Sequence, residues 1–89
     1  MDYQRIILLG NITTQAEVKQ APNGTRYALF TVAVGRGKDK AVFFPVALFG
    51  KSVEAAGEVL TKGTRVLIEG FLDQQGGKFR VLSSTFCKV

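Results

Sequence analysis

The residues that most suggest chemistry are Gly50-Lys51-Ser52, which match the end of the phosphate-binding loop G-x-x-x-x-G-K-[ST]. In such a loop, glycine-rich backbone wraps its amide groups around a phosphate. Here Pro45 stands where the first glycine is required, and the bulky residues 46–49 favour a strand. No second strand–helix–strand unit follows to complete a nucleotide site. The sequence therefore argues against a nucleotide-binding enzyme.

Other residue types used in catalysis are scarce in this chain. It has no histidine, which excludes nucleophile–histidine pairs and leaves a zinc site only carboxylates. Glu54 and Glu58 lie one helical turn apart, where we expect them to be solvated on an exposed face. Cys87 is the only cysteine, so we interpret it as structural or incidental. We predict no enzyme, no metal site and no cofactor.

Length and composition indicate one folded domain over residues 1–89. Hydrophobic residues make up 46% of the chain and charged residues 21%, which is typical of a globular protein. No apolar run approaches the ~20 residues that cross a bilayer, and the N-terminus does not resemble a signal peptide. We therefore expect a cytoplasmic protein with no membrane partner.

The charge is distributed unevenly along the chain. There are 12 basic against 7 acidic residues, and the basic excess lies in residues 36–51 and 65–89, separated by a slightly acidic segment. This pattern predicts one cationic face for a polyanion, although incidental surface charge is the alternative. The candidate cations of the two basic segments are Arg36, Lys38, Lys40, Lys51, Lys78 and Arg80.

The elements that must position these residues are short. Alternating apolar residues predict five strands, at residues 3–9, 26–34, 42–49, 65–72 and 78–84, with a short extended piece at 17–20. Turns are expected at 21–24 and 76–77, and a basic loop at 35–40. A helical period over 52–60 predicts one helix, capped by Ser52 at its start and by Gly63 after its end.

One short helix does not suit a doubly wound sheet, which needs a helix at each crossover. Five short strands with a helix between the third and the fourth suit a small closed barrel. We therefore predict an all-β, five-stranded barrel of the oligonucleotide-binding (OB) type, whose binding surface lies around strands 2 and 3.

The alternation of side chains along the third strand determines which of them are exposed on the barrel surface, because successive side chains point to opposite faces. Its two faces carry Phe44, Val46 and Leu48, and Phe43, Pro45, Ala47 and Phe49. The first face is a core stripe. The second face is either buried under the helix or a partner molecule, or it is exposed and presents its two phenylalanine rings beside basic residues. Rings beside cations are what unpaired nucleic acid needs, since bases stack on rings while Lys and Arg follow phosphates.

The remaining aromatic residues divide in the same way. Phe71 is a third stacking candidate, on the strand at 65–72. We assign four others to the core or to an interface between molecules, namely Tyr27, Phe30, Phe79 and Phe86.

Several stretches, weak singly but specific in their order, resemble one family along nearly the whole chain. They are RIILLGN (5–11), PNG (22–24), ALFTVAV (28–34), VALFGK (46–51), LTKG (60–63) and VLIEG (66–70). The sequence is similar to bacterial-type single-stranded DNA-binding proteins. That resemblance implies an OB fold, a homotetramer (a dimer being the alternative) and sequence-tolerant binding of single-stranded DNA. Phe43 and Phe49 match stacking positions of the family, and Arg5, Lys51 and Lys62 match basic ones.

The sequence also departs from this family. It has no tryptophan, and Lys38 stands near a usual stacking tryptophan. The turn at 74–77 and the loop at 35–40 are short, and the sequence ends without the acidic tail that recruits replication and repair proteins. We therefore expect a shorter footprint, weaker binding and no recruitment through a tail.

The expected function is protection of single-stranded DNA during replication, recombination or repair. Two alternatives remain. One is an OB protein like primosomal replication protein N, acting in replication restart, with which the short length and Gly70-Phe71-Leu72 are compatible. The other is an OB module that binds only protein.

Overall fold

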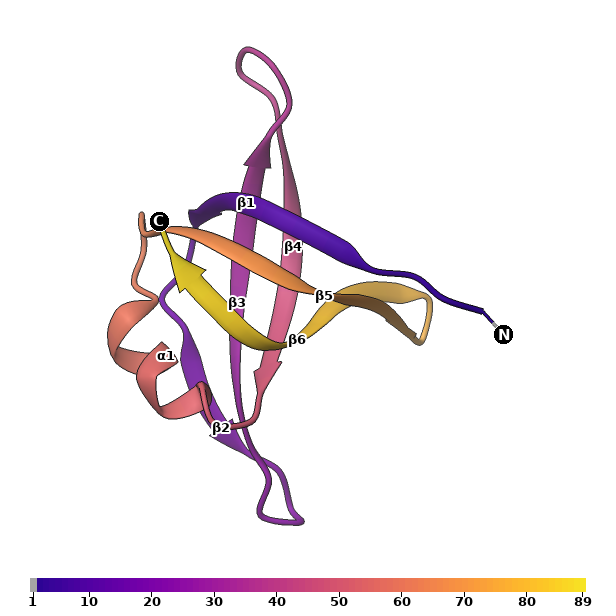
Figure 1. Cartoon of the computed structure of the whole chain (residues 1–89), viewed down its shortest axis with the longest axis vertical. Coiled ribbons are helices and arrows are strands. Elements are labelled where there is room, and N and C mark those ends of the chain that lie inside the picture. Colours follow the sequence, from indigo (N-terminus) through magenta and orange to yellow (C-terminus); the bar gives the residue numbers. More distant parts are fainter. Residues whose placement is uncertain (1) are drawn as a thin grey trace.

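The computed structural model describes residues 2–89 and contains six strands and one helix (Figure 1). In chain order they are β1 (Ile6–Ile12), β2 (Glu17–Gln20), β3 (Arg26–Gly35), β4 (Ala41–Phe49), α1 (Val53–Val59), β5 (Arg65–Gln75) and β6 (Lys78–Lys88). No helix in this part of the chain has the length and apolar character needed to span a bilayer.

The strands form a closed barrel. They are hydrogen-bonded in the order β1-β5-β6-β4-β3, and β1 returns to β3 through the pairs Asn11↔Ala33 and Ile12↔Val32. Only the β4–β6 pairing is parallel, over Val46 to Leu48 on β4. The strand β2 pairs with β3 beside this closure, so β1 and β2 together act as one interrupted strand. The predicted five-stranded barrel, with its helix between the third and fourth strands, is confirmed.

Two strands are longer than predicted. Gly76 and Gly77 both have positive φ, so the turn between β5 and β6 is tight and pairing continues to Gln75↔Lys78. At the other end β6 runs to Lys88, four residues beyond the expected range. The first strand starts later than predicted, at Ile6, and before it the Gln4 side-chain amide bonds both the N–H and the C=O of Leu72.

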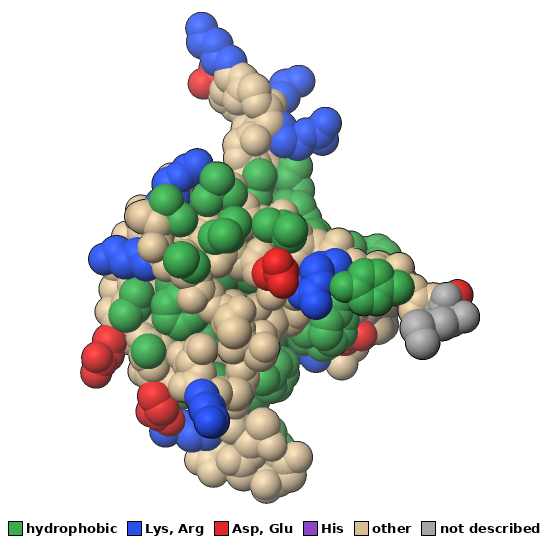
Figure 2. Space-filling model, viewed as in Figure 1, with side chains coloured by type: hydrophobic (Ala, Val, Ile, Leu, Met, Phe, Trp, Pro, Cys, Tyr) green, Lys and Arg blue, Asp and Glu red, His purple; other side chains and the backbone are tan. Residues whose placement is uncertain are grey.

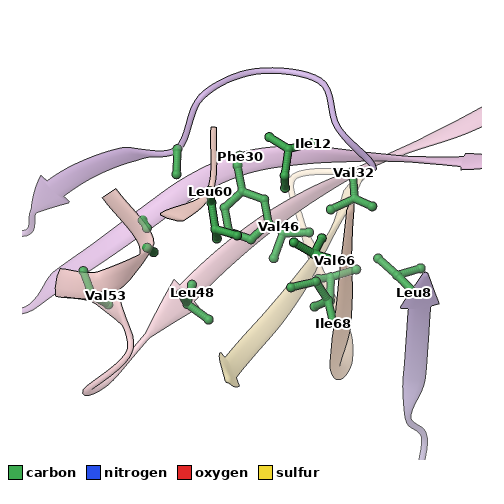
Figure 3. Close-up of a cluster of buried hydrophobic side chains, with 14 residues drawn as sticks. Leu8, Ile12, Phe30, Val32, Val46, Leu48, Val53, Leu60, Val66 and Ile68 are labelled. Atoms are coloured by element: carbon green, nitrogen blue, oxygen red, sulfur yellow. The ribbon is translucent and has the colours of Figure 1, made fainter. Parts of the chain in front are cut away.

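The barrel interior is filled by the inward-facing residues of every strand (Figure 3). Val32, Val46, Val66 and Ile68 meet there, almost completely buried. Side chains of α1 extend this core, because the helix packs against β2 and β3. Branched aliphatic side chains suit such positions, since they pack well on a pleated surface.

The strand β6 bends at a bulge opposite Glu69. Between the pairs Ile68↔Phe86 and Gly70↔Ser83, β5 advances by two residues while β6 advances by three. The buried Ser83 hydroxyl compensates for the interrupted ladder, since its Oγ lies 2.7 Å from the carbonyl oxygen of Glu69. The bend directs the first half of β6 toward β4.

The predicted apolar face of the helix is confirmed and Ser52 is its N-cap residue as predicted, but the predicted glycine cap at its C-terminus is wrong. Ser52 has helical φ and ψ and makes no side-chain cap hydrogen bond; its carbonyl instead accepts from Ala56. Gly63 lies beyond the C-cap residue, Leu60, in a turn where its N–H donates to Ile12 at 2.7 Å. Its positive φ therefore serves the junction with β1 rather than the helix end.

Closure of the barrel depends on Gly10. A Cβ at this position would lie 2.2 Å from the carbonyl oxygen of Ala33, so only glycine lets β1 cross β3 this closely. Gly10→Ala should lower the free energy of unfolding by about 1–3 kcal/mol, the usual cost of overpacking a core. Thermal or urea unfolding measures this.

Gly35→Ala is the matched control, because the nearest atom to its added Cβ is 4.0 Å away and its φ is not positive. We expect it to be neutral or slightly stabilising. Equal destabilisation by the two variants would contradict the close approach.

Candidate nucleic-acid interface

The outward face of β3 and β4 carries two aromatic sites. Phe43 is 61% exposed at one end of β4. Phe49, at the other end, is half-buried against Tyr27, with ring centroids 5.8 Å apart. Between them Pro45 is exposed, whereas Ala47 is buried beside its register partners on β3 and β6. The predicted alternation is confirmed, with Ala47 as the exception on the outer face.

Arg80 lies at the centre of this face. It lines one depression with Pro45 and Thr31, and a second with Tyr27 and Phe49. Its side chain therefore extends from β6 across β4 toward β3. Its Nε is 3.8 Å from a carboxylate oxygen of Asp73, the register partner of Arg80 on β5.

The loop between β3 and β4 supplies the first group of cations. Figure 2 shows Lys and Arg side chains gathered at the tip of this hairpin. The backbone N–H of Arg36 donates to the carbonyl of Lys40 at 2.8 Å, which closes the loop and keeps the two residues together. Both line a depression with Phe43, together with Asp39. A ring and two cations thus share one site.

Phe71 and Arg5 form a second group near Phe49. Phe71 is 48% exposed on the outward face of β5, and the three residues line one depression. Arg5 forms an exposed ion pair with Glu69, with 2.7 Å between Nη1 and Oε1. The hydrogen bond from its Nε to the Tyr3 hydroxyl, together with the charge of Glu69, raises the pKa of Arg5. Arg5 therefore remains charged but shares that charge with a neighbour.

These depressions share lining residues and so run into one another. Phe43 lines both the loop depression and a groove that Arg80 also lines. Arg80 lines that groove and the depression beside Phe49 as well. Phe49 lines this last depression and also the one that contains Phe71. We call this surface the aromatic track. Its rings and cations are Phe43, Phe49, Phe71, Tyr27, Arg36, Lys40, Arg80 and Arg5.

Four predicted cations lie beside the track or away from it. Lys38 is exposed in the same loop as Arg36, Lys51 is the second residue after β4, and Lys78 follows the β5–β6 turn. Lys62 is exposed in the turn before β5, at the β1–α1 junction rather than along the track.

Three residues of this surface were not predicted. Tyr27 supports Phe49, and Asp73 lies beside Arg80. Phe79, which we assigned to the core or an interface, is 58% exposed and therefore outside the core. The alternation of 78–84 places Phe79 on the inward face with Val81, but the barrel core does not reach that far.

The part of the chain that the structure describes has no cluster of side chains suited to a metal ion. Across residues 2–89, no three side chains of His, Cys, Asp or Glu gather where they could hold an ion. Glu54 and Glu58 are exposed as predicted, and Glu54 forms an ion pair with Arg26. Cys87 is a free, exposed thiol.

A closed five-stranded barrel with this topology, and with a helix between its third and fourth strands, is an oligonucleotide-binding fold. Residues 3–80 match the model of the single-strand binding protein family. The chain belongs to this family.

Individual relatives agree with this placement. Single-stranded DNA-binding proteins from Wolinella succinogenes and Helicobacter hepaticus are each 36% identical to it, over 85% of this chain. The match covers 56% and 53% of those proteins, so the chain spans about half the length of the curated relatives it matches. In the crystal structure of a deletion mutant of the Thermus aquaticus single-stranded DNA-binding protein, the matching region has a TM-score of 0.86 at 26% identity. It covers 98% of this chain and 41% of that one.

Proposed function

We propose that this chain binds single-stranded DNA without strong sequence preference and protects it during replication, recombination or repair. The observation that carries the proposal is the aromatic track, where exposed rings alternate with cations along the outward face of the barrel. The names of its relatives from Wolinella and Helicobacter support the same ligand. The proposed activity is binding alone, without catalysis, in the cytoplasm.

Stacking explains why no particular sequence is preferred. Every base has a π-face, and in single-strand binding proteins each base–ring stack contributes about 1–3 kcal/mol. In this proposal Phe43, Phe49 and Phe71 stack bases. Phosphates are contacted by cations on and beside the track, namely Arg5, Arg36, Lys38, Lys40, Lys51, Lys78 and Arg80. Lys62 contacts phosphate only if the strand continues around the barrel end.

We also propose that the chain assembles with copies of itself, as a tetramer or a dimer. Ile7 and Leu9 are 61% and 45% exposed on the outward face of β1, and Leu67 is the register partner of Leu9 on β5. Figure 2 shows hydrophobic side chains gathered over these strands. Adjacent exposed aliphatic side chains are typical of a protein–protein interface.

Phe43 is the cleanest test of stacking. Phe43→Leu keeps an apolar side chain but removes the ring, and should weaken binding to oligo-dT by about 1–3 kcal/mol. Phe43→Trp keeps a ring and should bind at least as well as the parent chain. Fluorescence anisotropy of labelled oligo-dT measures both. Phe49 is a poorer probe, because its truncation also removes the packing against Tyr27.

If Phe43→Leu binds oligo-dT as tightly as the parent chain, Phe43 is not a stacking ring. If the parent chain shows no binding at all, the proposed function is wrong and the barrel serves a protein partner.

The basic loop should control the salt dependence. Replacing both Lys38 and Lys40 by Ala should flatten the plot of log K against log salt by about 0.7 for each phosphate that is no longer neutralised. Replacing Arg65 and Lys88, which are exposed at the far end of the β5–β6 ladder, removes the same charge outside the proposed site and should leave the slope unchanged. Equal changes in the two double variants would indicate a general charge effect instead of binding by the loop.

Assembly is tested by light scattering with and without oligo-dT. The parent chain should have a mass of two or four times the 9.7 kDa of a single chain. Leu9→Lys should reduce it to a single chain, because the substitution places a charge in the proposed apolar interface. A parent chain with the mass of one molecule would exclude the assembly.

A further inference from the structure

The parallel pairing of β4 and β6 ends abruptly and leaves a groove. It extends only from Val46↔Val81 to Leu48↔Ser83. Beyond Val46 the strands are no longer paired, and a groove of about 270 Å³ lies between residues 43–45 of β4 and residues 79–81 of β6. Leu72 of β5 also lines it.

The groove is apolar because the β5–β6 hairpin continues past the barrel (Figure 1). The strand β1 pairs with β5 only as far as Ile6↔Gly70, whereas β5 and β6 remain paired to Gln75↔Lys78. Inward-facing side chains of this extension therefore have no core to cover them. Phe79 is 58% exposed for this reason, and Leu72 is also exposed.

The groove has a fixed shape on one side. The side-chain amide of Gln4 donates to the Leu72 carbonyl at 2.6 Å and accepts from its N–H at 3.1 Å. These bonds hold the backbone that carries Leu72 where no strand pairs with it on that side. On the other side, Pro45 and Phe44 are held by the pairing of β4 with β3.

One cation lines this apolar groove and two more lie beside it. Arg80 lines it directly, and Arg36 and Lys40 lie in the adjoining depression that Phe43 shares. The Nε of Arg80 is buried and has no hydrogen-bond partner within residues 2–89. A buried donor without a partner is unfavourable, and an acceptor oxygen of a ligand would relieve that cost. A ring pocket with cations at its rim fits a nucleotide, with the base inside and the phosphate outside.

We propose that this groove takes one unstacked base of the bound strand, with Phe79 as its stacking ring and Arg80 as its hydrogen-bond donor. The inference rests on the proposed function, and adds a binding position between β4 and β6, at the edge of the face formed by β3 and β4. A protein side chain from a second copy is the competing occupant, and the experiment below separates the two.

A tryptophan reporter tests the groove directly, because the chain has no tryptophan of its own. Phe79→Trp should lose much of its fluorescence on addition of oligo-dT, since stacking on a base quenches the indole. Ala55→Trp is the matched control: Ala55 is exposed on α1, away from the track, and its emission should not change. Phe79→Leu should weaken oligo-dT binding by about 5- to 150-fold, the loss expected for one ring–base stack.

The outcomes distinguish this inference from the proposed function. Binding of oligo-dT by Phe79→Trp without quenching, or unweakened binding by Phe79→Leu, would overturn the base site and leave single-strand binding in place. Absence of oligo-dT binding by the parent chain would overturn both. A change in Phe79→Trp emission with protein concentration, without DNA, would place a second copy in the groove and overturn the base site.

Discussion

The close crossing of β1 over β3 at Gly10 is the contact on which the rest of the molecule depends. Because no Cβ separates Gly10 from the carbonyl of Ala33, the five strands close into a barrel small enough to be filled by aliphatic side chains. Closure gives each strand one dry face and one outer face. The rings of Phe43 and Phe71 are on the outer face, so the barrel can be stable without burying them.

The same small barrel explains where the proposed binding surface is hollow. A short core cannot support the full length of the hairpins, so β3–β4 and β5–β6 both continue beyond it. One extension carries cations on a loop, and the other carries Phe79 and Leu72 without a covering layer. The groove between them follows from strand length and from the end of the β4–β6 pairing.

Much of this could be predicted from the sequence, because alternation and turn residues are local signals. The strand at 42–49 was placed within one residue, and its core face was correct. Ser52 shows the limit of a local signal: residue type correctly indicates the N-cap position, but Ser52 has helical φ and ψ and its side chain makes no cap hydrogen bond. Phe79 shows another limit. Its alternation was consistent with burial, yet burial depends on how far β1 extends along β5, a contact between residues over 60 positions apart.

The position of Arg80 depends both on the local sequence and on contacts between strands that are far apart in the chain. The sequence identifies it only as one cation among many, whereas the bulge in β6 and the pairing with β4 place it between the Phe43 and Phe49 sites. Its ion-pair partner, Asp73, lies 3.8 Å from its Nε, and both side chains are about a third exposed, so the pair is weak and screened by salt. A phosphate can therefore replace the carboxylate at little cost. In the proposed function, Arg80 is therefore available to a polyanion, and its charge is partly neutralised by Asp73 in the free protein.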